Sequence, residues 1–285
     1  METLILRDEI FLEHEPGPGH PENPGRLRAV HEALDREAVP GTRTVAPRAA
    51  DRPDLERVHR PEHIDRVAAT AGLAHVQLDP DTATSASSYE AALKGAGAVL
   101  DAVEATAGKQ ADGAFALVRP PGHHAESTAA MGFCLFNNVA VAAAHAVAEL
   151  GCRRVLVVDP DVHHGNGTQH TFYGRRDVLY VSSHRFPFYP GSGAHTEIGA
   201  GPGEGYTVNL PLPAGMGDAD FLHVYREVVD PVVRQYEPDL ILISAGFDTW
   251  QHDPLGGMRM TAEGYAALSG LFQRWGAEHC PGRLV

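Results

Sequence analysis

The chain has 285 residues and a formal net charge of −14 at pH 7. This length can bury a full core, and we expect a single domain over residues 1–285. The acidic balance argues against nucleic acid as the main ligand. Because the three cysteines lie far apart and form no Cys-x-x-Cys pair, neither a disulfide framework nor a thiolate zinc site is indicated; they are Cys134, Cys152 and Cys280.

The N-terminal residues lack the basic start and apolar core of a secretory signal. No stretch approaches the roughly 18 consecutive apolar residues of a membrane span. We therefore expect a soluble cytoplasmic protein with no membrane association.

Short apolar runs predict strands, and longer patterns with helical spacing predict the segments between them. The predicted strands are Ala114–Val118, Arg154–Val158, Val178–Ser182 and Leu240–Ser244, and the predicted helices are Tyr89–Ala107, Asn137–Leu150 and Asp218–Tyr236. The Gly/Pro-rich segment Tyr189–Gly205 is predicted to be a long ordered loop. Alternation of this kind predicts an α/β fold, an open parallel sheet flanked by helices on both faces.

Ligands of such sheets bind beyond the carboxyl ends of the strands. The predicted strand Arg154–Val158 is followed by Asp159, Asp161 and His163, and the predicted strand Leu240–Ser244 is followed by Asp248. Asp is seldom buried without a partner, so a divalent metal held by Asp161, His163 and Asp248 is indicated. Two carboxylates and one imidazole suit zinc, iron(II), manganese or cobalt, with positions left for water and substrate.

His123 and His124 follow the rigid Pro120-Pro121-Gly122 turn. Histidine transfers protons near neutral pH, so the pair suggests a general base with an acid or electrostatic partner. Asp159 is placed to orient one of the rings. The alternative is that these histidines only cap a loop.

Five motifs in order resemble the zinc-dependent histone deacetylase family: Pro121-Gly-His-His-Ala125, Gly132-Phe-Cys-Leu-Phe-Asn-Asn138, Asp159-x-Asp-Val-His-His-Gly-Asn-Gly-Thr-Gln169, Tyr189-Pro-Gly-Ser-Gly193 and Ser244-Ala-Gly-Phe-Asp248. The segment His20-Pro-Glu-Asn-Pro-Gly-Arg-Leu27 is similar to bacterial and class II members. The resemblance implies an arginase/deacetylase-like fold and a hydrolase that removes acyl groups from lysine side chains or from small acetylated amines.

The resemblance also implies a role for each matching residue. Asp161, His163 and Asp248 would bind zinc, with iron(II) as the alternative ion, and His124 would activate water. His123 would pair with Asp159, and Asn166 agrees with the class II pattern. Further residues would contact substrate or the acetate route (Gly132, Phe133, Tyr189, Leu255 and Arg26) or form a structural potassium site (Asp159, Asp161, His163, Ser182 and Ser183).

Leu255 bears on the choice of substrate within this family. Enzymes that prefer acetylated polyamines carry an acidic residue where Leu255 follows Asp253-Pro254. A neutral side chain there offers no attraction to a second ammonium group, so acyl-lysine is favoured and acetylpolyamine is the alternative.

One family feature is missing from the 285 residues. The resemblance implies a catalytic tyrosine in a Gly-Gly-Tyr loop after a late strand, but Arg283-Leu-Val285 falls within that strand, and the last tyrosine, Tyr265, has helical spacing typical of core packing. We expect either that the natural chain continues beyond Val285 or that it is a truncated member of the family that lacks this tyrosine. The 285 residues are then expected to bind metal and deacetylate weakly, and a non-catalytic acyl-lysine binder is a further alternative.

Ureohydrolases share the broad fold and an Asp-x-His motif but use two metals. Their additional carboxylates would fall at Gly165 and Trp250, neither of which can bind metal. One metal ion per chain is therefore predicted. The sequence carries no periodic signal for an oligomeric state.

Overall fold

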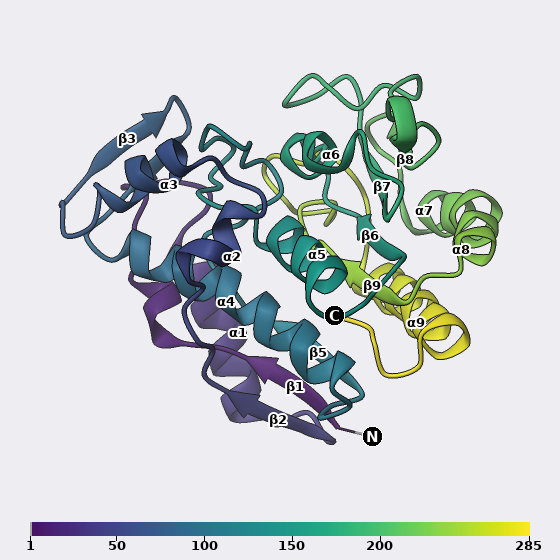
Figure 1. Cartoon of the computed structure of the whole chain (residues 1–285), viewed down its shortest axis with the longest axis horizontal. Helices are drawn as coiled ribbons and strands as arrows, with labels where there is room; N and C mark the ends of the chain where they lie inside the picture. The colour runs from purple at the N-terminus through teal and green to yellow at the C-terminus, as the bar shows by residue number, and fades with distance from the viewer. Residues whose placement is uncertain (1) are drawn as a thin grey trace. The chain divides into compact units, whose positions relative to one another are not determined.

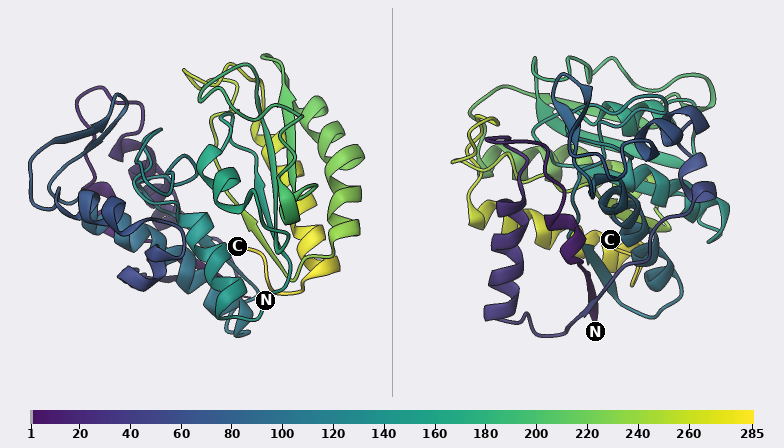
Figure 2. Two further views of the ribbon diagram at one scale, coloured as in Figure 1. Left: turned by 45° about the horizontal axis from the view of Figure 1, so that its top comes forward. Right: turned by 90° about the vertical axis from the view of Figure 1, so that its left-hand side faces the viewer.

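The computed structural model describes residues 2–285, which form two compact units (Figure 1, Figure 2). Unit 1 contains the described residues up to Leu150 together with Val285, and unit 2 is Gly151–Leu284. Each unit has a parallel sheet with helices packed on it, so the predicted α/β class is confirmed. Among the described residues, no helix combines the length and apolarity needed to cross a bilayer.

The sheet of unit 1 has three parallel strands in the order β2-β1-β5. Helix α4, Ser88–Ala107, packs on it through small residues and meets α2, α3 and α5 with its other side. Helix α4 also lies close to the segment before α2: a Cβ atom added at Gly97 would lie 2.0 Å from the Arg48 carbonyl oxygen. The other elements are β1 (Thr3–Leu6), η1 (Glu9–Leu12), α1 (Pro24–Arg36), β2 (Thr42–Val45), α2 (Arg52–Glu56), α3 (Pro61–Ala68), β3 (Val76–Asp79), β4 (Thr82–Thr84), β5 (Gly113–Ala116) and α5 (Asn138–Ala148).

The sheet of unit 2 has four parallel strands in the order β8-β7-β6-β9. Helices α7, α8 and α9 cover one face of it (Figure 2, left), and their apolar side chains form one core with the strands. The elements are β6 (Val155–Asp159), α6 (Asn166–Phe172), β7 (Val178–Arg185), η2 (Gly201–Gly203), β8 (Thr207–Leu212), α7 (Asp218–Val224), η3 (Tyr225–Val229), α8 (Asp230–Tyr236), β9 (Leu240–Ile243) and α9 (Ala262–His279).

The predicted helix Asp218–Tyr236 is present but not uniform. Its middle, Tyr225–Val229, is a turn of π-helix in which the Asp230 N–H donates to the Tyr225 carbonyl oxygen. Pro231 explains the change, because proline has no N–H and its ring crowds the carbonyl group four residues earlier. The wider turn places the buried Tyr225 hydroxyl 2.9 Å from Ser183 Oγ.

The outer edge of β9 pairs with the last residues of unit 2. The Ile241 N–H donates to the Arg283 carbonyl oxygen at 3.0 Å, and Leu284 forms a parallel bridge with Ile241. This agrees with the predicted strand character of Arg283–Val285.

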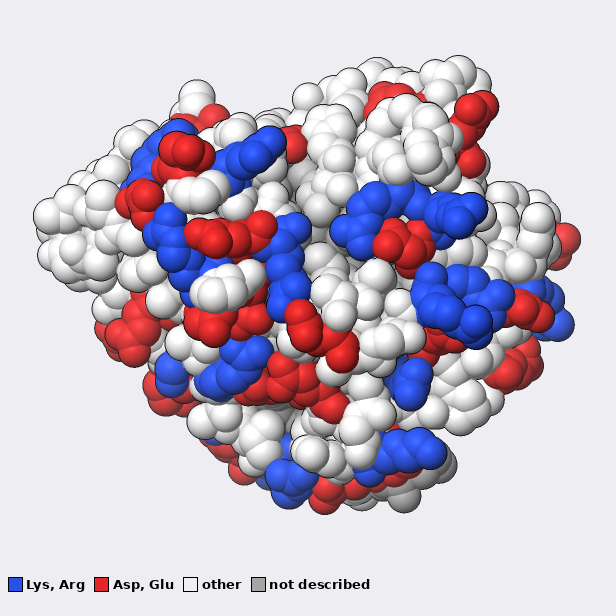
Figure 3. Space-filling model, viewed as in Figure 1, with Lys and Arg blue, Asp and Glu red and all other residues white. Residues whose placement is uncertain are grey.

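Charges of both signs are interspersed on the face drawn in Figure 3. In unit 1, Arg52 forms ion pairs with both Glu56 and Asp65. The basic side chains on this face therefore alternate with acidic ones.

Candidate metal and acyl-lysine site

The predicted ligands Asp161, His163 and Asp248 form one cluster in unit 2, with potential ligand atoms within 4.8 Å of one another. Asp161 and His163 lie in the loop after β6, and Asp248 lies in the loop after β9. These strands are parallel neighbours, so their carboxyl ends meet at one edge. His163 Nδ1 lies 3.2 Å from Asp161 Oδ1 and 2.9 Å from Asp248 Oδ2.

Backbone groups hold the two carboxylates in place. The His163 N–H donates to Asp161 Oδ1 at 2.7 Å, and the Val162 N–H donates to Asp248 Oδ1 at 2.8 Å. Gly246 leaves room for Asp161, because a Cβ atom at that position would lie 1.8 Å from Asp161 Oδ2. The Gly-Phe-Asp segment thus needs its glycine for the cluster to form.

The electrostatics of the cluster favour a cation. Burial and the like charge of Asp161 raise the pKa of Asp248 to about 6. Burial opposes the charged form of His163, but hydrogen bonds with Asp161 and Asp248 outweigh it and raise the pKa of His163 to about 10. Two crowded carboxylates that share one imidazole therefore fit a divalent ion, which would replace the proton between them.

Asp159 is fully buried at the end of β6. Its Oδ2 accepts a hydrogen bond from the Tyr180 hydroxyl at 3.0 Å, and its Oδ1 accepts from the Asp161 N–H at 3.3 Å. The Tyr180 oxygen also accepts from the Gly165 N–H at 3.1 Å. Tyr180 thus connects Asp159 to the loop that carries the predicted ligands Asp161 and His163. The sequence did not predict this role, because a tyrosine within a buried strand resembles a core residue.

His123 and His124 lie in unit 1, in the turn that follows β5. Both side chains are buried, with ring centroids 4.0 Å apart. Gly122 lets the turn lie against the start of α5, since a Cβ atom there would be 2.6 Å from the Asn138 nitrogen. Gly132 packs on the His124 ring, since a Cβ atom added at position 132 would lie 2.3 Å from His124 Cδ2.

Gly132 and Phe133 form a turn with φ values of 56° and 70°. The Gly132 N–H donates to Asp81 Oδ1 at 3.0 Å, and the Phe133 N–H donates to Thr82 Oγ1 at 2.9 Å. The ring of His20 meets the Phe133 ring edge-on at 4.6 Å. The turn is therefore held by the β3–β4 hairpin about 50 residues earlier, and no local sequence pattern predicts this contact.

Another buried histidine of unit 1 has a structural role. His59 Nε2 accepts a hydrogen bond from the Asn137 N–H at 2.9 Å, and its Nδ1 lies 2.9 Å from the Glu126 carbonyl oxygen. Burial lowers the pKa of His59 to about 3. A neutral ring with both nitrogens engaged supports the segment before α5.

Four further predicted residues of unit 2 lie in β7 or in the loops that follow β7 and β9. The Tyr189 ring is 6.0 Å from the His163 ring, and Leu255 is 43% exposed. Ser182 Oγ lies 2.9 Å from His184 Nδ1, and Ser183 bonds the Tyr225 hydroxyl. The Tyr189–Gly205 segment is irregular apart from η2 and is held by hydrogen bonds such as Ala200 N–H to Tyr173 O at 2.8 Å, as expected of an ordered loop.

The predicted residues divide between the units. Unit 2 contains the predicted metal ligands and the other predicted residues Asp159, Asp161, His163, Asn166, Ser182, Ser183, Tyr189, Asp248 and Leu255. Unit 1 holds His123, His124, Gly132 and Phe133, with Arg26 exposed near the start of α1. That the residues of unit 1 and those of unit 2 act together in one reaction stays a prediction.

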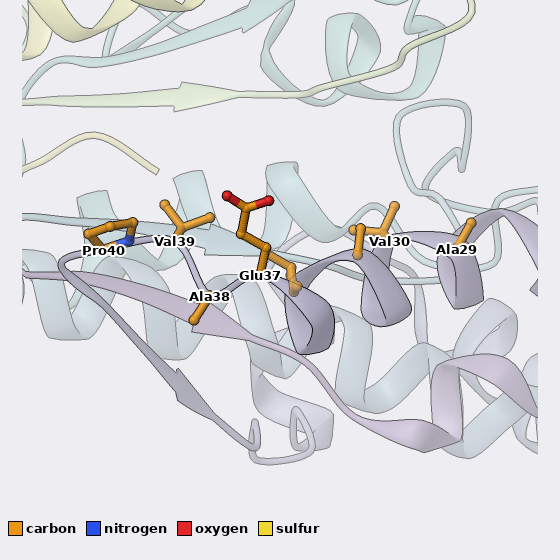
Figure 4. A pocket seen from close by; sticks show the side chains of 8 residues that line it. Ala29, Val30, Glu37, Ala38, Val39 and Pro40 are labelled. Carbon is orange, nitrogen blue, oxygen red and sulfur yellow. The ribbon is translucent and has the colours of Figure 1, made fainter.

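A shallow pocket of about 580 Å³ in unit 1 is a different feature (Figure 4). The end of α1 and the residues that follow it form this pocket, and its side chains are apolar apart from Glu37. A single carboxylate among Ala, Val, Leu and Pro provides no proton-transfer pair and no metal-binding set, so it is not the candidate site.

Parallel sheets with helices, and an Asp–His–Asp cluster beyond two strand ends, define an arginase/deacetylase-like fold. The crystal structure of the HDA15 HD domain matches 99% of this chain and 83% of that chain, with a TM-score of 0.93 and 41% identity. A sequence profile described as "Histone deacetylase domain" matches residues 20–285. The chain therefore belongs to the histone deacetylase domain family.

Similar sequences occur in an archaeon and in plants. A "Probable deacetylase" of Archaeoglobus fulgidus is 38% identical over 100% of this chain and 80% of its own length. "Histone deacetylase 15" of Arabidopsis thaliana is 42% identical over 100% of this chain and 51% of its own length. The chain thus spans about half the length of that plant relative.

Proposed function

We propose that the protein is a metal-dependent amidohydrolase that removes acetyl or other acyl groups from lysine side chains. The observation that carries the proposal is the cluster of Asp161, His163 and Asp248 in a member of the histone deacetylase domain family. Its histone deacetylase relatives support acetylated lysine as the substrate.

Asp161, His163 and Asp248 would hold a single divalent ion, with zinc as the first candidate and iron(II) as the second. When bound, such an ion polarises an amide carbonyl and lowers the pKa of water. Asp159, Asp161, His163, Ser182 and Ser183 would contribute to a structural potassium site.

His124 would accept a proton from the attacking water, and His123 would be its partner, oriented by Asp159. The burial of both rings supports this assignment, because excluding solvent strengthens the electrostatic effect of each imidazole. Asn166, which is buried at the start of α6, would take the position beside the second imidazole.

Gly132, Phe133, Tyr189 and Leu255 would line the path of the acyl-lysine chain. Their aromatic and apolar character suits the four methylene groups of lysine. Arg26 would lie on the route by which acetate leaves.

The substrate class is tested by comparing kcat/KM on an acetyl-lysine peptide and on acetylspermidine. We expect the peptide to be favoured by about tenfold or more, because neutral Leu255 offers no charge to a second ammonium group and a tenfold preference needs only about 1.4 kcal/mol. Leu255→Glu should reduce this preference by raising kcat/KM for acetylspermidine. A wild-type preference for acetylspermidine would instead support the polyamine alternative.

A further inference from the structure

In unit 2 the side chains of His163, Phe188 and Arg185 form a layered stack, and His163 belongs to the proposed metal-binding cluster. The His163 and Phe188 rings are nearly parallel, with centroids 5.2 Å apart and planes 16° apart. The guanidinium carbon of Arg185 lies 4.1 Å from the centroid of the same Phe188 ring. Phe188 therefore contacts both a proposed metal ligand and a cation.

Arg185 also joins three segments around the cluster. At the end of β7, its N–H donates to the Val162 carbonyl oxygen at 2.8 Å, between two of the proposed ligands. Its Nη1 donates to the Gly256 carbonyl oxygen at 3.3 Å, next to Leu255. The backbone and side chain of Arg185 thus connect the loops that carry the proposed ligands, Tyr189 and Leu255.

The guanidinium group of Arg185 is not paired with a carboxylate. Within residues 2–285, no carboxylate lies within 4.0 Å of its guanidinium, whereas Arg175, Arg234 and Arg274 each have an acidic partner. The Phe188 ring and the Gly256 carbonyl oxygen are therefore the partners of this cation. A cation over a ring face is attracted by the ring quadrupole, so the charge holds Phe188 in place.

We propose that Arg185 is a positioning residue for the metal site, acting through Phe188 on the ring of His163. The stack restricts rotation of the imidazole and keeps Nδ1 directed at Asp161 and Asp248. Hydrogen-bond partners of metal-binding histidines fix the ring orientation, and here a stacked ring would have the same effect. The inference rests on the proposed function only in taking Asp161, His163 and Asp248 as ligands, and it requires no catalytic turnover.

The test is Co²⁺ binding, measured by calorimetry and by the visible absorption of the bound ion. Arg185→Met keeps an unbranched side chain and removes the charge together with the hydrogen bond to Gly256, and Phe188→Leu removes the ring. Each is expected to weaken Co²⁺ binding by about 10–100-fold and to alter the absorption spectrum. Arg185→Lys should restore affinity to within about threefold of wild type, since a lysine cation also binds a ring face.

Arg175→Met is the matched control. The guanidinium carbon of Arg175 lies 5.1 Å from the centroid of the Phe172 ring in the same unit, but neither residue is proposed to contact a metal ligand. It should leave Co²⁺ affinity unchanged, and thermal unfolding of the metal-free proteins should separate loss of fold from loss of binding. Wild-type affinity and spectrum in both Arg185→Met and Phe188→Leu would overturn the proposal. If the chain binds Co²⁺ as expected but shows no deacetylation, the proposed function fails while this inference stands.

Discussion

Asp248→Asn should lower divalent metal affinity by at least about 100-fold, above the range typical of losing a partner outside the ligand set. Asparagine preserves the shape of the side chain, and its oxygen can still accept the 2.8 Å hydrogen bond from the Val162 N–H. What it removes is one of two negative charges that favour a cation. Metal content after dialysis and Zn²⁺ affinity by competition with a chelating dye measure the effect.

Asp239→Asn is the control for this substitution. Asp239 precedes β9, whereas Asp248 follows it, and its carboxylate accepts the backbone N–H groups of Arg153 and Arg154 at 2.8 and 3.0 Å. We expect this variant to retain metal. If both variants bound Zn²⁺ as tightly as wild type, Asp248 would not be a ligand.

His124→Ala should reduce deacetylation by about 10²–10⁴-fold, the usual contribution of a general acid or base. Metal content and the affinity for an acetyl-lysine peptide should persist, because the proposed ligands are other residues. Single-turnover assays at high enzyme concentration measure the rate, and fluorescence anisotropy of a labelled peptide measures binding.

His145→Ala serves as the comparison, since His145 is a buried histidine of α5 with no proposed role in the reaction. It should keep most of the activity of wild type. Unchanged turnover in His124→Ala would exclude His124 as the base. A wild-type protein that binds the peptide but never hydrolyses it would favour the non-catalytic alternative.

The sequence was most informative where a short apolar run met charged residues. The run Val155–Val158 is fully buried as β6, and the polar residues after it could be assigned to a site because burial without a partner is costly. Asp248 could be added since parallel strands present their carboxyl ends at the same edge, and β6 and β9 are indeed neighbours. The sequence alone therefore predicts all three residues that the structure brings into one cluster.

Elements with weak local signals were missed. β8 contains Pro211, which is unfavourable inside a sheet, but β8 is an edge strand and tolerates it. β1 has only four residues, too few to show a period. These strands are stabilised by their neighbours rather than by their own pattern.

The residues that orient the site could not be predicted either. Tyr180 supports Asp159 across 21 positions, and Asp81 supports Gly132 across 51. Arg185 and Phe188 look like an ordinary charged residue and an ordinary apolar one. Their roles depend on distances set by the tertiary fold, which sequence spacing does not contain.

The most direct test is a titration of the metal-free chain with Zn²⁺, following deacetylation of an acetyl-lysine peptide and bound metal together. A single ion held by Asp161, His163 and Asp248 predicts that activity rises with added metal and reaches its maximum at one equivalent per chain. Full activity without metal, or a maximum at two bound equivalents, would contradict this account.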